Sequence, residues 1–444
     1  MTTHQTRSDI ADEGHAEALN VLRSCATEAG FLASPATHAN YRRVWGRDGS
    51  IMGLAALASG DEELIDAARR TLVTLAEHQG PRGEIPSNVD PATGRVSYGG
   101  TAGRVDAGLW FAVACAEYWR YTQNETFLHE MLEPLERLRW ILGAWEFNAR
   151  GLLYVPPTGD WADEYVQSGY VLYDQLLYLQ AQRGIAHLHE ALHGGVDHAL
   201  GERIARLCHL IEANYWFDPD EGDEIPNDAY HPVLYRKGRE AAGHCRGRYW
   251  MPFFSPLGYG TRFDGMANGL ASLFGVADAS RDDAVDAYIA EELVHEDVML
   301  VPAFDPVITP RDEYWDDLQM SFSHTFKNQP YAYHNGGLWP LVTAFHAAAA
   351  GAPGTPPGGA TLPGRHPRRQ PAAAGRPAVV VLGVPARPHL RAGGHASHGL
   401  ERGGGAHRRR LPGRRALVRV GRAFLPKRRA APALGPIAPT HGAS

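Results

Sequence analysis

The sequence has few cysteines, no long apolar run and little sustained strand alternation. Four cysteines are spread over 444 residues and none stands in a C-x-x-C pair, which excludes a disulfide framework and argues against a thiolate metal site. No stretch approaches the roughly 20 apolar residues of a membrane span. Residues 1–14 are polar and lack the apolar centre of a secretory signal. We therefore expect a cytoplasmic protein without a membrane segment.

Acidic and basic residues are divided unevenly along the chain, although the net charge is only −7. Residues 352–444 hold 17 of the 43 Lys and Arg and a single acid, Glu401, which leaves 26 basic against 49 acidic residues in 1–351. The same last segment contains 14 of the 31 prolines and one aromatic residue, Phe424. Such a composition buries too little apolar surface to offset the entropy of ordering, so we predict a disordered tail over 352–444.

Two interpretations of residues 352–444 are open. A basic arm for nucleic acid would explain the arginine runs, although the interleaved aromatic residues of a single-strand binder are absent. An out-of-frame read of a GC-rich gene would give the same mixture, because Gly, Ala, Pro and Arg have GC-rich codons. The abrupt change straight after a well-formed helical segment favours the second interpretation, so nucleic acid is not an expected partner.

Residues 1–351 show helical spacing of apolar residues in about ten segments. We expect helices over 15–29, 48–59, 61–79 with Asp61 as its cap, 104–122, 124–147, 170–190, 198–215, 265–276, 282–296 and 337–350. Four longer connections join them, at 80–103, 148–169, 217–261 and 295–335. These connections hold most of the Trp, Tyr and Asp residues, which predicts an all-α scaffold with functional groups on loops at one end.

The segment Gly159–Tyr165 is the strongest candidate for chemistry. Three acids and Trp161 fall within five residues, Asp160 to Glu164, on a loop followed by a periodic helix. An apolar indole raises the pKa of a nearby carboxyl, as a proton donor needs, or offers a flat face to a sugar ring. The plainer interpretation is that Asp160 or Asp163 caps the following helix and that the other acids are solvated.

Five short motifs follow one another between residues 41 and 350. They are Val44–Asp48 (W-x-R-D), Arg104–Phe111 (V-D-A-x-L-W-F), Asp160–Asp163 with Tyr173–Gln175 (an acid loop and its helix), Arg262–Gly275 (F-D-x-x-x-N-x-L-A-x-L-F-G) and Tyr333–Pro340 (Y-H-N-G-G-x-W-P). In this order they resemble the six-hairpin glycoside hydrolases, above all the neutral/alkaline invertases and the glycogen-debranching amylo-1,6-glucosidases. The resemblance implies an (α/α)6 toroid, and it ends near Gly351.

The resemblance also implies roles for individual residues. Asp163 takes the position of the family's general acid, which protonates the leaving-group oxygen. Arg47 and Asp48 match residues that bind sugar hydroxyls, for which a bidentate Arg and an acceptor Asp are suited. The other candidate substrate-binding residues are Trp45, Asp106, Trp110, Asp160, Trp161, Gln175, His334, Asn335 and Trp339.

Several of these residues also have a plain structural interpretation. Arg47 and Asp48 can form a surface ion pair, tryptophans more often belong to a core, and Asp106 at a helix start is favoured by the helix dipole. A lone histidine such as His334 is more often structural, and no H-x-H or H-x-x-E-H spacing predicts a metal. No cofactor is expected, and the expected partner is a carbohydrate.

One family feature has no match. Such glycosidases invert the anomeric centre with a second carboxylate, about 6.5–9.5 Å from the acid, that activates water. The family's base is a Glu in a W-x-E loop after the W-P helix, and in this chain that region is the Arg/Pro/Gly-rich segment, where Glu401 matches nothing. About ten helices against the family's twelve likewise predict a toroid incomplete at its C-terminal hairpin. Asp316 or Asp317 as a substitute base has no support in the pattern.

We therefore predict a glycosidase catalytic domain over 1–351, with its last hairpin missing, and a disordered Pro/Gly/Ala/Arg-rich tail over 352–444, for which an out-of-frame origin is the favoured interpretation. The predicted reaction is inverting hydrolysis of sucrose or of an α-glucosidic oligosaccharide, impaired by the absent base. The alternative is a carbohydrate-binding pseudo-enzyme without turnover, and a third is an interaction role for the basic tail. A sugar epimerase on the same barrel would need paired histidines, whereas the histidines are scattered, at His187, His189, His193 and His198.

Overall fold

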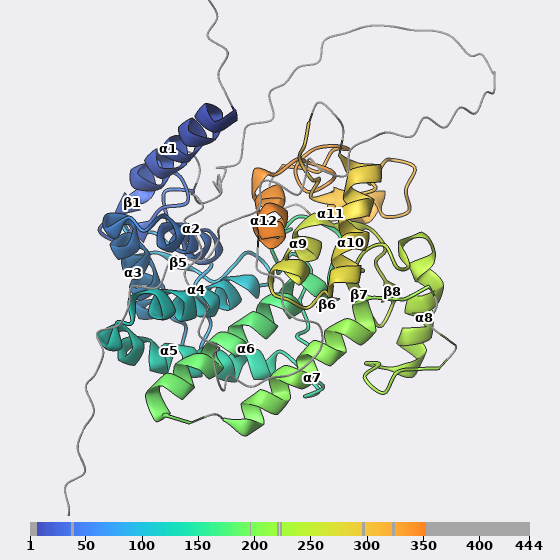
Figure 1. The fold of residues 1–444 in the computed structure, drawn as a ribbon, viewed down its shortest axis with the longest axis horizontal. Coiled ribbons are helices and arrows are strands. Elements are labelled where there is room, and N and C mark those ends of the chain that lie inside the picture. The colour runs from blue at the N-terminus through green and yellow to red at the C-terminus, as the bar shows by residue number, and fades with distance from the viewer. Residues whose placement is uncertain are drawn as a thin grey trace, which may run out of the picture.

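The computed structural model describes residues 7–351 except 37–39, 196, 220–221, 223, 295–297 and 322–324. The predicted disordered or out-of-frame tail, 352–444, lies outside the described residues. Twelve α-helices occur in the described part (Figure 1). They are α1 (Arg7–Cys25), α2 (Gly46–Ser59), α3 (Glu62–Glu77), α4 (Asp106–Thr122), α5 (Glu125–Ala144), α6 (Leu172–His193), α7 (His198–Tyr215), α8 (Pro232–Ala242), α9 (Gly265–Leu273), α10 (Ala279–Tyr288), α11 (Trp315–Met320) and α12 (Pro340–Gly351).

Ten very short strands accompany the helices and pair antiparallel in four small sheets, β1-β2, β3-β4-β5, β6-β7-β8 and β9-β10. Three of these strands, β3, β6 and β9, run directly into the helices α2, α6 and α9. The strands are β1 (Ala26–Thr27), β2 (Gly30–Phe31), β3 (Val44–Trp45), β4 (Asn88–Val89), β5 (Val96–Ser97), β6 (Tyr170–Val171), β7 (Phe253–Ser255), β8 (Gly258–Tyr259), β9 (Phe263–Asp264) and β10 (Phe304–Asp305).

The helices predicted from apolar spacing all occur, with shifted ends, and two others were not predicted. The predicted helix 282–296 is α10 followed by a π-turn at Ile289–Leu293. Helix α8 lies inside the predicted connection 217–261, and the short α11 lies inside 295–335. Helix α8 buries one side at Tyr235, Gly238 and Ala242, which recur at helical spacing, so the signal was present in the sequence but was not recognised.

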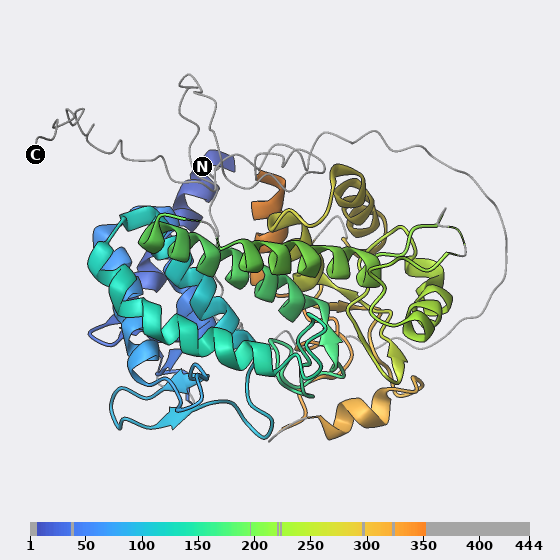
Figure 2. The same ribbon diagram turned by 90° about the horizontal axis from the view of Figure 1, so that it is seen from below.

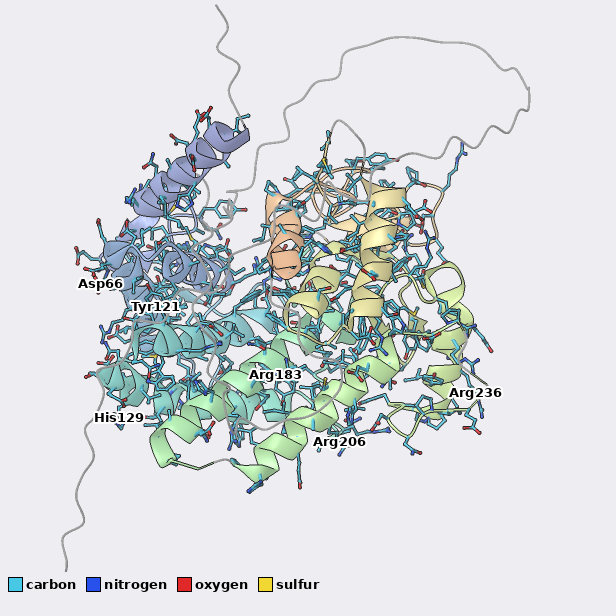
Figure 3. All side chains as sticks on the ribbon, viewed as in Figure 1. Asp66, Tyr121, His129, Arg183, Arg206 and Arg236 are labelled. Atoms are coloured by element: carbon cyan, nitrogen blue, oxygen red, sulfur yellow. The ribbon has the colours of Figure 1, made fainter. Side chains whose placement is uncertain are left out.

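Burial separates inner from outer helices. Thirteen of the 17 residues of α4 are buried, and α6 is likewise buried on most sides, as expected for helices enclosed by others. By contrast, α3 buries one stripe that includes Leu64, Ala68 and Leu72. Exposed polar side chains such as Asp66 on α3 and Arg206 on α7 lie on the outside of the molecule (Figure 3).

The inner helices form a row in which each packs against the next. Helix α2 packs against α4, α4 against α6, α6 against α9, and α9 against α12, while α3, α5 and α7 cover α2, α4 and α6 from outside. This alternation of inner and outer helices is the all-α, (α/α) barrel arrangement that the motifs implied. Within the described residues, comparable packing does not occur between α12 and α2, so this part of the chain leaves the inner ring open there.

The inner helices begin at one end of the barrel. Arg47 in the first turn of α2 pairs with Asp106 at the start of α4, and Tyr173 in the first turn of α6 donates to the same carboxylate. Trp339, just before α12, contacts Trp161 in the loop before α6. Figure 2 shows strands β4 and β5 and helix α11 along the lower edge of the molecule, which is this end. No described helix combines the length and apolar character needed to cross a membrane.

Candidate active site

Asp163 lies in the loop between α5 and α6, and both of its carboxylate oxygens accept hydrogen bonds. Nη2 of Arg104 lies 2.6 Å from Oδ2, and the hydroxyl of Tyr333 lies 3.4 Å from Oδ1. The Asp163 side chain keeps 22% of its surface exposed. The predicted acid is therefore partly exposed at the end of the barrel where the inner helices begin, which we call the barrel mouth. It does not cap α6, whose N-cap is Val171.

The charges around Asp163 correct one part of the sequence argument. Burial acts to raise the pKa of this carboxyl, but the positive charge of Arg104, with a smaller contribution from Arg47, holds the pKa below its ordinary value. The expectation of a raised pKa at Asp163 is therefore wrong, because the neighbouring positive charges outweigh the effect of burial. The indole of Trp161 instead stacks on Phe304, with ring centroids 5.7 Å apart.

Arg47 and Asp106 begin a chain of hydrogen bonds from the mouth into the core. Nη1 of Arg47 lies 2.9 Å from Oδ2 of Asp106, a buried side chain, and Nε lies 3.7 Å from the Asp48 carboxylate. The Tyr173 hydroxyl donates to Asp106 at 3.2 Å and accepts from Nε1 of Trp110 at 2.7 Å. The plain Arg47–Asp48 surface pair is thus a minor contact, because the main partner of Arg47 is Asp106.

Three residues predicted to bind substrate are structural in this fold. Trp110 is only 1% exposed, so its ring cannot stack on a sugar that enters from the mouth. The amide of Gln175 bonds both backbone groups of Leu153, and the amide of Asn335 bonds both backbone groups of Ile308. Both amides are fully buried and fix loops at the barrel end.

An aromatic wall stands beside Asp163. The ring of Tyr333 stacks on His334 at 4.1 Å and lies 5.6 Å from Trp339. His334 also packs against Trp161 at 5.1 Å, and burial lowers the pKa of His334 to about 3. The histidine is therefore a neutral part of the wall, whereas the partly exposed Tyr333 and Trp339 are the rings that a sugar can reach.

Three further residues at the mouth were not predicted as site residues. Tyr41 stacks on Trp45 with ring centroids 6.1 Å apart. Nζ of Lys327 lies 4.8 Å from the centre of the Tyr333 ring and 3.4 Å from the Glu164 carboxylate. Arg104 belongs to one of the five motifs, whereas Tyr41 and Lys327 lie outside them and reach the site only through the fold.

The carboxyls with raised pKa values lie beneath the mouth. Burial, with the nearby charge of Asp106, raises the pKa of Asp160 to about 8, and burial raises the pKa of Asp264 to about 7. Burial also raises the pKa of Asp174. Asp160 accepts a hydrogen bond from Gln167 and is 1% exposed, so it supports the site from below and does not reach a bound sugar.

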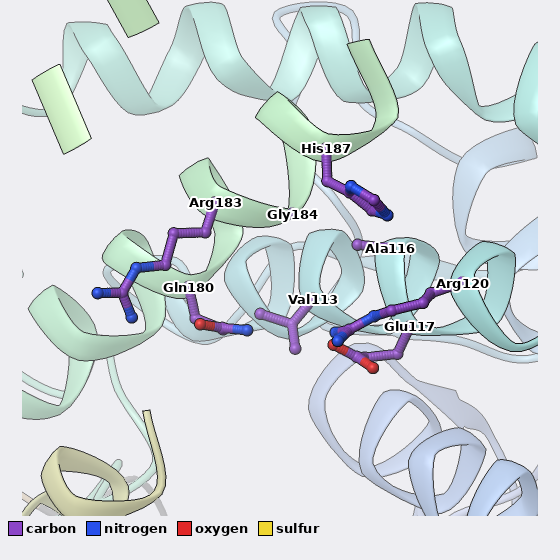
Figure 4. A pocket seen from close by; sticks show the side chains of 8 residues that line it. All are labelled: Val113, Ala116, Glu117, Arg120, Gln180, Arg183, Gly184 and His187. Atoms are coloured by element: carbon purple, nitrogen blue, oxygen red, sulfur yellow. The ribbon is translucent and has the colours of Figure 1, made fainter. Parts of the chain in front are cut away.

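The remaining acids do not form a metal centre in the described part of the chain, where no three His, Cys, Asp or Glu side chains are arranged to hold an ion. Asp316 and Asp317, considered as substitute bases, lie exposed on α11. A separate hollow opens between α4 and α6 (Figure 4) and contains none of the predicted site residues. It is lined by Val113, Ala116, Glu117, Arg120, Gln180, Arg183, Gly184 and His187.

Solved structures share this fold. An uncharacterized conserved protein from Thermus thermophilus is 14% identical with a TM-score of 0.53, and the alignment covers 76% of this chain and 86% of that one. A GH63 mannosylglycerate hydrolase from the same organism, in complex with glucose, is 15% identical with a TM-score of 0.50 and the same coverage. A GH78 rhamnosidase of Bacillus sp. GL1 reaches a TM-score of 0.49 at 15% identity, over 77% of this chain and 28% of its own length.

The helical hairpins thus have the fold of the GH63 mannosylglycerate hydrolase. Over residues 23–176, the sequence matches the model of the amylo-alpha-1,6-glucosidase family. The matched residues include Arg47, Asp48, Arg104 and Asp163, and they end before the aromatic wall around Trp339. No curated protein matches the sequence. The predicted likeness to the debranching glucosidases is thereby confirmed, and that to the invertases stays a prediction.

Proposed function

We propose that the chain binds an α-glucosidic oligosaccharide, or sucrose, at the barrel mouth and cleaves its O-glycosidic bond with Asp163 as the general acid. The observation that carries this proposal is the position of Asp163. Its partly exposed carboxylate stands at the open end of the barrel, between the Arg47–Asp48 pair and the aromatic wall. The barrel mouth thus holds a candidate proton donor, charged groups that can bind sugar hydroxyls, and aromatic rings on which a sugar can pack.

The other mouth residues support binding of a polar ring. The Asp48 carboxylate is partly exposed next to Arg47 and accepts hydrogen bonds from sugar hydroxyls, while the guanidinium donates to them. Tyr333 contacts Asp163 and packs against Trp339. Trp45 is the N-cap residue of α2, next to Arg47 and Asp48. A sugar held by Arg47 and Asp48 then presents its glycosidic oxygen to Asp163, with an aromatic face against its apolar surface.

The second candidate function is carbohydrate binding without turnover. It is favoured by the ion pair between Asp163 and Arg104, because an ionised carboxylate has no proton to donate. It is also favoured by the sequence prediction that the water-activating base is absent, since removing one acid or base commonly slows a reaction by about 10²–10⁴-fold. On this account the mouth retains the sugar but the bond stays intact.

A hydrolysis assay with branched maltooligosaccharides, isomaltose and sucrose tests the first proposal. We expect slow release of monosaccharide, which Asp163→Asn reduces by at least about 100-fold, whereas Asp316→Asn, an exposed acid on α11, leaves the rate unchanged. Turnover that persists in Asp163→Asn would refute the acid assignment.

Calorimetry with the same sugars separates the two functions. Binding that Asp48→Ala abolishes, together with no detectable hydrolysis, would establish the binding protein in place of the enzyme. If the chain neither binds nor cleaves any of these sugars, both candidate functions are wrong.

A further inference from the structure

We propose that Arg104 is a positioning residue for Asp163, which holds the acid loop in place and keeps the carboxylate ionised until a sugar separates the pair. This inference rests on the proposed function, because it assigns a role to a neighbour of the proposed acid. Arg104 has no role in the sequence prediction beyond its membership of a motif. Its importance follows from the contacts that its side chain and the next residue make.

The segment before α4 clamps the acid loop at three points. Nη2 of Arg104 lies 2.6 Å from Oδ2 of Asp163, and Nη1 donates to the carbonyl of Thr158 in the same loop. The backbone N of Val105 donates to the carbonyl of Gly159 at 2.8 Å. Thr158 adopts a left-handed conformation with φ of 65°, which is uncommon for a residue with a Cβ and is stabilised here by the bond to Arg104.

Arg104 is the cation that acts directly on Asp163, because the other two nearby cations have acidic partners of their own. Arg47 is paired with Asp106 at 2.9 Å, and Lys327 is paired with Glu164 at 3.4 Å. The remaining titratable groups that face Asp163 are Tyr41, Asp48, Tyr333 and His334. None of these is a cation near neutral pH, because burial lowers the pKa of His334 to about 3.

The chemistry requires the pair to open. A general acid donates a proton to the glycosidic oxygen as the bond to the sugar breaks, so Asp163 must first take a proton from solvent. The guanidinium, 2.6 Å from Oδ2, favours the ionised carboxylate, so the intact pair opposes that protonation. Both side chains are partly exposed, 14% for Arg104 and 22% for Asp163. A sugar hydroxyl can therefore accept from Arg104 in place of Asp163, which frees Oδ2 to become protonated.

The test is a titration of Asp163 by carboxyl ¹³C NMR on protein labelled at aspartate, with the signal assigned by its loss in Asp163→Asn. In Arg104→Gln we expect the pKa of Asp163 to rise by about one unit or more, because a direct opposite charge lowers a carboxyl pKa by about 1–3 units. Arg104→Lys retains the charge, so we expect a pKa close to that of the wild type. Equal values in wild type and Arg104→Gln would overturn the proposal.

A second readout uses turnover. Activity that depends on a protonated acid is lost as the pH rises through the pKa of that acid, so Arg104→Gln should move the alkaline limb of the kcat/KM profile to higher pH. A merely structural role for Arg104 would lower the whole profile without moving this limb. Arg104→Lys should keep the limb at its wild-type position, and a limb unmoved in Arg104→Gln contradicts the proposal.

Two conditions keep the test decisive. If Arg104→Gln does not fold, the wild-type protein is titrated at low and at high KCl. Screening of the partly exposed pair should then raise the pKa of Asp163, and an unchanged value would count against Arg104. The NMR titration needs no sugar. If the chain neither binds nor cleaves sugars, the proposed function fails, while the titration still decides whether Arg104 controls Asp163.

Discussion

Nη1 of Arg47 lies 2.9 Å from Oδ2 of Asp106, and this pair joins the first turn of α2 to the start of α4. The Asp106 side chain is 1% exposed, and its carboxylate also accepts from the hydroxyl of Tyr173 at the start of α6. Three inner helices therefore meet at one buried carboxylate, which makes the geometry of the mouth depend on a single charged group.

Asp106→Asn should destabilise the protein by about 3–5 kcal/mol, because it leaves the largely enclosed Arg47 guanidinium without its main counter-charge. The measurement is urea unfolding followed by circular dichroism. Asp66→Asn is the matched control, since Asp66 forms an exposed ion pair with Arg70 on α3 and should cost less than about 1 kcal/mol. A similar loss of unfolding free energy in both variants would show that the buried pair stabilises the protein no more than the exposed pair does.

Asp160 should make the stability of the protein depend on pH. The pKa of Asp160 is about 8 in the folded chain and close to 3.9 when unfolded, so the folded state binds a proton that the unfolded state releases. Its stabilising contribution is fully present below about pH 4 and is lost as the pH rises towards 8, by up to about 1.4 kcal/mol per pH unit.

Asp160→Asn removes this titration and should flatten the fall in unfolding free energy between pH 5 and pH 8. Asparagine keeps the shape and stays neutral, so the variant should be the more stable protein at pH 8. Unfolding in urea across this pH range measures the slope, with Asp316→Asn as the control at an exposed acid. A slope equal to that of the wild type would show that Asp160 does not hold the proton.

Trp339→Ala should weaken sugar binding by about 1 kcal/mol, roughly fivefold in Kd, because the ring would no longer pack on the sugar face. Titration calorimetry with the sugars of the hydrolysis assay provides the measurement. Trp140→Ala is the matched control, since Trp140 is 67% exposed on α5 and outside the mouth. If Trp339→Ala binds the sugar with unchanged affinity, the Trp339 ring does not contact the bound sugar.

Gly184→Ala should destabilise the barrel by about 1–3 kcal/mol through overpacking. A Cβ at Gly184 on α6 would lie 2.8 Å from the Cβ of Ala116 on α4, closer than carbon atoms approach. Ala116→Gly in the same chain should recover part of the loss, because it removes the opposing methyl group. Thermal unfolding of both single variants and the double variant measures the coupling, and additive losses would contradict the close approach.

Local patterns in the sequence predicted local structure well. Asp61 was expected to cap a helix, and its carboxylate accepts from the backbone N of Glu63 and Leu64 at the start of α3. The helices followed from apolar spacing, and the barrel class followed from the resemblance of the five motifs, in their order, to the six-hairpin glycosidases. Such signals succeed because caps and amphipathic stripes depend on residues within a few positions of one another.

The chemistry of the site depended on contacts that the sequence does not show. Arg104 approaches Asp163 from 59 positions away, so the cation that lowers the pKa of the acid was missed. The motif around Trp110 was recognised, but a motif does not say which face of α4 points to the mouth, and Trp110 faces the core. The sequence therefore identified candidate residues, but the direction in which their side chains point became known only from the packing of the helices.

Arg104, Val105 and Asp106 are consecutive, and they bind Asp163, Gly159 and Arg47 in turn. The same three residues therefore hold both the proposed proton donor, Asp163, and the proposed sugar-binding arginine, Arg47. A one-residue insertion there would shift Arg104 relative to Asp106 and so disturb both contacts together. The distance between the two proposed functional side chains is thus set by three residues at the start of α4.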